Sequence, residues 1–288
     1  MADVVWVSYH EDKGIDHRGY YDHAFLEEMF KDYEHHLDFK GMERGGIVVV
    51  PARVHVMDTT QLNKDLSDMD WCLVILTGDE EGSFPWRELA HKRMKVWVMH
   101  PRIGMHDEAF KLPNGYRPTT RPLLKEMGFQ ERTQDWFFAG QINHARREEC
   151  VTALREMTGG TLIETDGFAK EVMPYPEYIA NLAKTKIAPC PSGIETPDSF
   201  RLYEALEAGC LPIVDSHATN TPERGYWTYL FSGEVPFPIV EDWSVLPQLI
   251  PELLKDYPHN ANKAFAWWMQ EKRKIRNRLQ EDLYELQR

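Results

Sequence analysis

Short apolar runs of strand length alternate along the chain with segments in which apolar residues recur every three or four positions. This alternation is typical of βαβ units, in which helices connect parallel strands. In the first part of the chain it predicts strands at residues 4–8, 45–50, 71–76 and 95–99, and helices at residues 23–39, 58–66 and 86–93.

The alternation of strand-like and helix-like segments stops between residues 101 and 134. This segment contains several prolines, the turn-forming pair Asn114-Gly115 and one predicted helix at residues 121–127, as a connection between domains would. Beyond it the alternation resumes, and predicts strands at residues 136–139, 161–164, 186–190, 211–214 and 235–240, and helices at residues 145–157, 176–184, 199–208, 246–255 and 264–288.

The pattern therefore predicts an α/β protein of two Rossmann-like domains that face a cleft. We expect an N-terminal domain at residues 1–132, a C-terminal domain at residues 133–264, and a closing helix at residues 265–288. In such folds ligands bind beyond the carboxyl ends of the strands. The chemistry should therefore lie in the loops that follow the strands.

Charge and cysteine content narrow the class of protein. The formal net charge is −13, which disfavours binding of nucleic acid over the whole surface. The first residues have neither a basic segment nor a long apolar one, so we expect a cytoplasmic protein without a signal peptide. The four cysteines form no close pair and are expected to be buried free thiols, listed as Cys72, Cys150, Cys190 and Cys210.

The segment from Pro189 to Val214 reads as strand, loop, helix, glycine and strand. Asp198 or Ser199 can cap the helix, whose N-terminus offers N–H groups and partial positive charge to a diphosphate. Arg201 lies in the first turn and can bind phosphate, and Glu204 follows one turn later, where a carboxylate suits ribose hydroxyls. An ordinary capped helix between two strands is the competing interpretation.

This segment resembles the C-terminal half of exostosin-like glycosyltransferases, which have the GT-B fold. The matching residues are 195–201, 204–205 and 208–214, and the upstream stretch 136–141 with Arg146 and Arg147 is similar to the entry of the family's nucleotide domain. The resemblance covers about residues 135–215. It implies that Arg201 binds the donor diphosphate and Glu204 the ribose. It also implies that residues 1–132 form an acceptor domain, that residues 133–264 bind the nucleotide sugar, and that the closing helix crosses back to the N-domain.

A second polar segment follows the strand at residues 136–139. Gly140 would let a ligand approach the backbone, and Gln141, Asn143, His144 and Arg146 lie close to a helix start. A solvated loop with a basic helix face is the alternative. The residues predicted to bind the donor are Gly140, Gln141, Arg146, Ser192, Glu195, Ser199, Arg201 and Glu204.

Transfer to a hydroxyl needs a group that takes its proton. His10 and Asp12 follow the first strand, and Asp79 follows a buried strand in an acidic loop, so these three are the predicted catalytic residues. Each of them can instead be an ordinary solvated polar residue. No metal is expected, because the Asp68-Met-Asp70 motif precedes its strand and would lie at the wrong edge of the sheet.

The sequence thus predicts a metal-independent glycosyltransferase that uses a nucleotide-diphosphate sugar, which we expect to be a UDP-sugar, and needs no other cofactor. The alternative is a non-catalytic protein that binds a nucleotide sugar or a glycan. The acceptor is left open among a hydroxylated DNA base, a glycan, a protein and a small molecule. The basic stretch from Lys272 to Arg278 is the one hint of DNA, and a solvated face paired with acids is its plainer interpretation.

Overall fold

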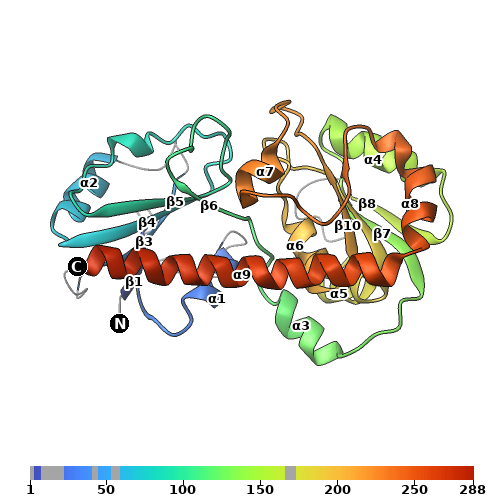
Figure 1. Ribbon diagram of the computed structural model, residues 1–288, viewed down its shortest axis with the longest axis horizontal. Coiled ribbons are helices and arrows are strands. Elements are labelled where there is room, and N and C mark those ends of the chain that lie inside the picture. Colours follow the sequence, from blue (N-terminus) through green and yellow to red (C-terminus); the bar gives the residue numbers. More distant parts are fainter. Residues whose placement is uncertain (1–2, 8–22, 41–44, 53–58, 166–172) are drawn as a thin grey trace. The chain divides into compact units, whose positions relative to one another are not determined.

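The computed structural model describes residues 3–7, 23–40, 45–52, 59–165 and 173–288 (Figure 1). The chain divides into two compact units. Unit 1 comprises residues 1–114 and 272–288, and unit 2 comprises residues 115–271. Residues 115–132, which the sequence analysis placed in the first domain, therefore belong to unit 2.

Unit 1 is built on a six-stranded sheet in the order β2-β1-β3-β4-β5-β6, and all its paired strands run parallel. Its elements before the closing helix are β1 (Asp3–Trp6), α1 (Ala24–Met29), β2 (Glu34–His36), β3 (Gly45–Pro51), α2 (Thr59–Ser67), β4 (Trp71–Thr77), η2 (Trp86–Glu88), β5 (Met94–Met99) and β6 (Phe110–Leu112). The strands are parallel and covered on both faces, which explains why they read as nearly continuous apolar runs.

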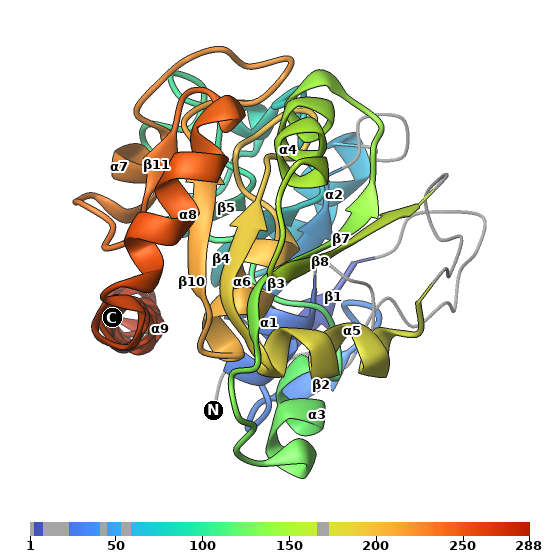
Figure 2. The ribbon, with the colours of Figure 1, turned by 90° about the vertical axis from the view of Figure 1, so that its right-hand side faces the viewer.

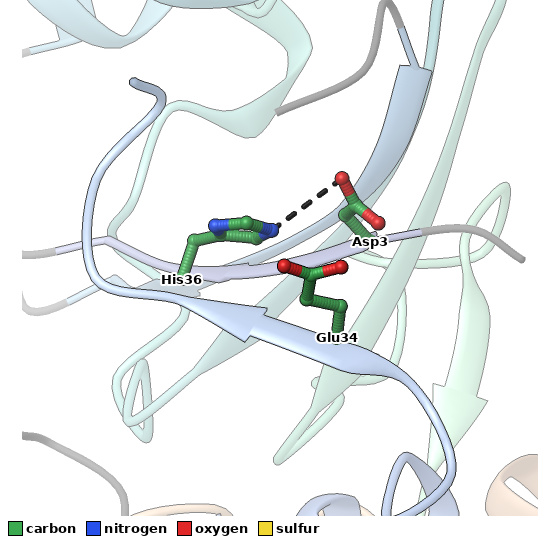
Figure 3. Close-up of side chains that lie close together, drawn as sticks. All are labelled: Asp3, Glu34 and His36. Carbon is green, nitrogen blue, oxygen red and sulfur yellow. Dashed lines mark ion pairs between the residues drawn. The ribbon is translucent and has the colours of Figure 1, made fainter. Parts of the chain in front are cut away.

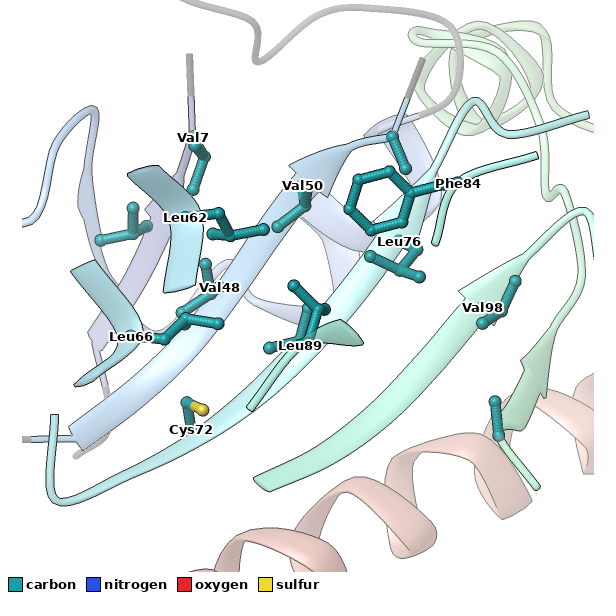
Figure 4. Close-up of a cluster of buried hydrophobic side chains, with 14 of the residues drawn as sticks. Val7, Val48, Val50, Leu62, Leu66, Cys72, Leu76, Phe84, Leu89 and Val98 are labelled. Carbon is teal, nitrogen blue, oxygen red and sulfur yellow. The ribbon is translucent and has the colours of Figure 1, made fainter. Parts of the chain in front are cut away.

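Alternate side chains of these strands form one core cluster with the apolar face of α2 (Figure 4). Val48, Val50 and Leu76 from the sheet pack in it with Leu62 and Leu66 from the helix. Successive side chains of a strand point to opposite faces. The residues that alternate with these core residues, such as Val49 and Ile75, therefore pack on the other face of the sheet.

Unit 2 contains a five-stranded, wholly parallel sheet in the order β11-β10-β9-β7-β8. Its elements are α3 (Thr120–Met127), β7 (Gln134–Gln141), α4 (Ala145–Arg155), β8 (Gly160–Thr165), α5 (Tyr175–Ala183), β9 (Thr185–Cys190), α6 (Phe200–Glu207), β10 (Leu211–Asp215), α7 (Tyr226–Phe231), β11 (Ile239–Val240), η3 (Trp243–Val245) and α8 (Leu246–Leu254). Helices α4 and α8 lie together on one side of the sheet, and α5 and α6 lie together on the other, with α3 packed against them (Figure 2).

The last helix, α9 (Tyr257–Gln287), is shared between the two units. Its residues up to Glu271 belong to unit 2, where Trp268 donates a hydrogen bond to Glu207. From Lys272 onwards it belongs to unit 1, where the buried Asp282 accepts hydrogen bonds from Trp97 and Lys95. Among the described residues, no helix is long and apolar enough to cross a membrane.

Two alternating parallel α/β units confirm the predicted mixed α/β class, although several predicted elements were wrong. The helix predicted at residues 23–39 ends at Met29, and residues 34–36 instead form the edge strand β2. The helix predicted at residues 86–93 is the short 3-10 turn η2, because Leu89 adopts an extended backbone. The strand predicted at residues 235–240 is reduced to Ile239–Val240. The four cysteines are free and buried, as predicted.

Candidate functional site

The topological switch point of the unit 2 sheet, where the strand order reverses, lies between β7 and β9. Counted along the unit, its strands run 2-1-3-4-5, and the chain turns in opposite directions from β7 and from β9. In doubly wound sheets, ligands bind at such a point, beyond the carboxyl ends of the strands. Here those ends are Gly140-Gln141 and Cys190, with the loop of Ser192 following β9.

Arg201 reaches this point from the first turn of α6. Its Nη2 donates a hydrogen bond to the carbonyl oxygen of Ala139 at 3.1 Å, and its guanidinium lies over the ring of Phe138, 4.7 Å from the centroid. A Cβ atom at Gly140 would lie 2.3 Å from the same Nη2. A side chain at position 140 would therefore force the Arg201 guanidinium to shift from its place at the strand end.

Three buried polar atoms of Arg201, of the loop after β9 and of the α6 N-cap have no hydrogen-bond partner. They are the Arg201 Nε and the hydroxyl oxygens of Ser192 and Ser199. Ser199 is the N-cap residue of α6, but its side chain makes no capping bond, contrary to the capping role predicted for it. Buried polar groups normally find partners, so donors of this kind, two of them at the start of α6, are suited to an anion that would satisfy them.

Glu204 lies one turn further along α6 and is 3% exposed. Its carboxylate accepts a hydrogen bond from the hydroxyl of Tyr175 at 2.8 Å. The Tyr175 ring is in turn stacked on Tyr178 and covered by Arg117, whose guanidinium carbon lies 4.2 Å from the ring centroid. Burial raises the pKa of Glu204, because a charged carboxylate loses hydration there.

Arg146 is held in a buried ion pair with Asp215, at the carboxyl end of β10. Its Nε donates to Asp215 Oδ1 at 2.9 Å, and Trp243 donates to the same oxygen at 2.8 Å. The other oxygen, Oδ2, accepts the backbone N–H of Ser192 at 2.8 Å. Arg146 is thus linked through Asp215 to the backbone of Ser192, and the binding of the donor by Arg146 stays a prediction.

Glu195 lies in the loop after β9, and Gln141 is the last residue of β7, at the same edge of the sheet. The Glu195 carboxylate accepts a hydrogen bond from the side-chain amide of Asn220, which ties the loop after β9 to the loop after β10. The Gln141 carbonyl accepts a hydrogen bond from Arg147 at 3.3 Å. The structure therefore brings all the predicted donor residues to the carboxyl edge of one sheet, with Arg146 and Glu195 serving loop contacts.

His144, the N-cap residue of α4, adds a neutral group to this edge. Its Nδ1 lies 3.0 Å from the hydroxyl of Thr219. Burial, followed by the nearby charge of Arg147, lowers the pKa of His144 to about 4. The imidazole is therefore uncharged at neutral pH.

Of the predicted catalytic residues, Asp79 lies in the described part of the chain, in the turn after β4. His10 and Asp12 lie outside the described residues. Asp79 is 4% exposed, and its carboxylate accepts the backbone N–H groups of Ser83 at 2.9 Å and Phe84 at 3.0 Å. Since the Phe84 ring belongs to the core cluster, Asp79 closes the turn that fixes this ring in place (Figure 4).

One group of side chains in the described part of the chain has the spacing of a metal site (Figure 3). Asp3, Glu34 and His36 offer ligand atoms within 4.8 Å of one another. They come from β1 and β2, whose register pairs Asp3 with Glu34 at the first residue of each strand. Asp3 and Glu34 thus lie at the amino ends of these strands, away from the edge where doubly wound sheets bind ligands. The ion pair of 3.4 Å between His36 and Asp3 is a sufficient structural reason for the cluster.

Sequence reasoning missed two residues of this site, Asp215 and Tyr175. Asp215 is a single acidic residue at the carboxyl end of an apolar strand, and this position could have indicated a site residue from the sequence. Tyr175 contacts Glu204 from a position 29 residues away, and no local pattern indicates such a pairing.

A comparison with known protein families finds a match over the part of the chain that contains most of these residues. Residues 143–285 match the family model described as the RXYLT1 C-terminal domain. No curated protein is significantly similar to the chain in sequence. The family match covers the Arg201 and Glu204 helix, the Ser192 loop and the Arg146–Asp215 pair, and it relates this part of the chain to glycosyltransferases.

Proposed function

We propose that the protein transfers a glycosyl group from a nucleoside-diphosphate sugar to a hydroxyl of an acceptor. The observation that carries this proposal is the setting of Arg201 at the carboxyl end of β7, with its Nε and the Ser192 and Ser199 hydroxyls unpartnered. The relation of residues 143–285 to glycosyltransferases supports the same reaction class.

In this proposal the diphosphate binds at the N-terminus of α6. The guanidinium of Arg201 and the helix N–H groups offer positive charge and donors to it. As the bond between the sugar and the diphosphate breaks, negative charge grows on the leaving oxygen, and fixed donors of this kind stabilise it. This supply of charge from the chain itself supports a transfer that needs no metal.

The nucleoside would bind on the Glu204 side of Arg201. The Glu204 carboxylate, which accepts a hydrogen bond from the Tyr175 hydroxyl in this structure, would instead accept hydrogen bonds from the ribose hydroxyls. We propose a UDP-sugar as the donor.

The acceptor would be a small hydroxylated molecule, a glycan or a protein rather than a hydroxylated DNA base. In α9, Arg276 pairs with Glu28 and Arg278 pairs with Asp282. These acids neutralise much of the basic stretch that hinted at DNA. This observation favours the solvated face over a phosphate-binding surface.

The test is binding of UDP, GDP, ADP and CMP by calorimetry, with and without EDTA, to the wild-type protein and to Arg201→Ala and Arg201→Lys. We expect UDP to bind the wild type equally well with EDTA, and Arg201→Ala to bind at least about 100-fold more weakly, since charged hydrogen bonds of this kind contribute about 1.5–3 kcal/mol each. Arg201→Lys should recover part of the loss, because it keeps the charge but not the planar fork.

Two outcomes would contradict the proposal. Full affinity in Arg201→Ala would mean that the diphosphate does not bind at α6. Nucleotide binding without release of UDP from any UDP-sugar, with every acceptor class tried, would support the non-catalytic binding protein instead.

A further inference from the structure

A chain of hydrogen-bond contacts runs from the start of α3 to Glu204 within unit 2. The Thr120 hydroxyl donates to the backbone carbonyl of Arg117 at 2.7 Å. The same hydroxyl oxygen is in hydrogen-bond contact with the hydroxyl of Tyr175, which lies 2.8 Å from Oε1 of Glu204. Thr120 is 0% exposed and Glu204 is 3% exposed, so the hydrogens of these contacts come from the four groups themselves.

The number of hydrogens in this chain decides the state of Glu204. Three contacts between oxygen atoms need one hydrogen each, and the Arg117 carbonyl has none to give. Since the Thr120 hydrogen binds that carbonyl, the hydrogen of Tyr175 must fill the contact with Thr120. The contact between Tyr175 and Glu204 is then complete only when the carboxyl group brings the third hydrogen. An ionised Glu204 would take the Tyr175 hydrogen and leave one of the other two contacts without one.

The surroundings of Glu204 favour the same neutral form. Among the described residues Glu204 has no ion pair, and burial raises its pKa by more than the charges of Arg117 and Arg201 lower it. A buried carboxylate without a paired cation is unfavourable, because it loses hydration and gains no compensating charge. The Tyr175 phenol keeps its hydrogen, since burial raises its pKa as well. The charged and titratable groups that face the carboxyl are Arg117, Tyr175, Tyr178, Cys190 and Arg201.

We propose that Thr120 and Tyr175 keep Glu204 as a neutral carboxylic acid, and that this acid recognises the ribose of the donor both as a hydrogen-bond donor and as an acceptor. The inference rests on the proposed function, in which the nucleoside binds beside Glu204. Thr120 and Tyr175 are positioning residues, since they act through Glu204. Thr120 thereby gains a role in donor binding, although it precedes the family match at residues 143–285.

A neutral acid suits the two neighbouring hydroxyls of a ribose. Its carbonyl oxygen accepts a hydrogen bond from one hydroxyl, and its O–H group, released from Tyr175, donates to the oxygen of the other. The hydrogen of Tyr175 stays on Thr120, so the proton of Glu204 stays on the carboxyl group throughout. Arg201 lies one turn before Glu204 in α6, and the diphosphate proposed to bind there is an anion. A neutral Glu204 does not repel this anion, whereas a carboxylate would.

The first test compares the full-length wild type with Glu204→Gln in the absence of nucleotide. An amide has the shape of the neutral acid, and its NH₂ group can donate to Tyr175 as the acid does. The free energy of unfolding of both proteins is measured in urea from about pH 5 to about pH 8. A carboxyl group whose pKa is raised by folding takes up a proton as the chain folds. Stability therefore falls as the pH rises from the unfolded value, about 4.3, to the pKa of the folded protein.

We expect the wild type to lose stability relative to Glu204→Gln as the pH rises, by up to about tenfold in the folding equilibrium constant per pH unit. Thr120→Ser and Thr120→Val, each made with Glu and with Gln at position 204, form a matched pair. Serine keeps the hydroxyl and should preserve the pH dependence. Valine has the same shape without the hydroxyl and frees the Tyr175 hydrogen for an ionised Glu204. In that background the difference between Glu and Gln should shrink by about tenfold or more, the effect of one hydrogen bond to a charged group.

The second test is calorimetric titration with UDP at neutral pH. Glu204→Gln should bind UDP at least about tenfold more tightly than Glu204→Leu, because the amide keeps both an acceptor and a donor for the ribose and leucine has neither. The melting temperature of each variant is measured alongside, so that a loss of folding is not mistaken for a loss of affinity.

Three results would overturn the inference. The stability of Glu204→Gln relative to the wild type would be the same at every pH, Thr120→Val and Thr120→Ser would show the same pH dependence, or Glu204→Gln and Glu204→Leu would bind UDP equally while the wild type binds it more tightly. A wild type that binds no nucleotide would instead contradict the proposed function, and the unfolding measurements would still decide the state of Glu204.

Discussion

At the scale of single residues, Gly140 shows how a missing side chain serves the site. The Cβ of an alanine would lie 2.3 Å from Arg201 Nη2, so the guanidinium would have to shift from its present position. We therefore expect Gly140→Ala to weaken UDP binding by about tenfold or more, which corresponds to about 1.4 kcal/mol. Calorimetric titration with UDP measures this change.

The control for this prediction is Gly233→Ala. A Cβ there meets its nearest atom, the Phe231 carbonyl oxygen, at 4.0 Å, and φ is not in the left-handed region. Gly233→Ala should leave UDP affinity unchanged. Equal affinity of the two variants for UDP would show that the position of Arg201 does not matter for donor binding.

At the scale of elements, the buried Arg146–Asp215 pair connects three of them. Arg146 extends from α4, Asp215 ends β10, and the bound N–H of Ser192 lies in the loop after β9. Arg146→Met should lower the free energy of unfolding by about 3–5 kcal/mol, because it leaves a buried carboxylate without its cation. Urea unfolding, followed by the fluorescence of tryptophan, measures the loss.

The double variant Arg146→Met with Asp215→Asn is the control, because it removes both charges of the buried pair. Removing both charges together should recover part of the lost stability, since no uncompensated charge remains. If Arg146→Met is as stable as the wild type and instead loses UDP affinity, then Arg146 binds the donor as the sequence first indicated, and its pairing with Asp215 is secondary.

The burial of each strand explains whether it could be predicted from the sequence. Central strands such as β4 are buried throughout, so their apolar runs stand out in the sequence. The edge strand β2 does not, since its residues Glu34–His36 are polar. Its course depends on Trp6, whose indole donates to His35 Nδ1 at 2.8 Å, and on Phe30, whose carbonyl lies 2.9 Å from His35 Nε2. These contacts override the helical periodicity that begins at Phe25.

The candidate site divides in the same way. Arg201 and Gly140 were predictable because the carboxyl end of a strand and the start of a helix can be read locally. The partnership of Arg146 with Asp215 was not, because 69 positions separate them.

At the scale of the whole molecule, α9 makes the stability of unit 1 depend on the end of the chain. Asp282 is 1% exposed and accepts hydrogen bonds from Trp97 at 2.7 Å, Lys95 at 2.6 Å and Arg278 at 2.8 Å. Asp282→Ala would leave the buried Trp97 N–H without a partner. We expect the free energy of unfolding of unit 1 to fall by about 3 kcal/mol, and calorimetric melting to show it.

Glu285→Ala is the matched control, because Glu285 also pairs with Lys95 but its side chain is 64% exposed. Such a surface pair contributes about 0–1 kcal/mol, so this variant should melt close to the wild type. UDP affinity should be unchanged in both variants, because the proposed donor residues belong to unit 2. Equal melting temperatures for Asp282→Ala and Glu285→Ala would mean that α9 is held by its apolar residues, Ile275, Leu279 and Leu283, and that the buried carboxylate adds little.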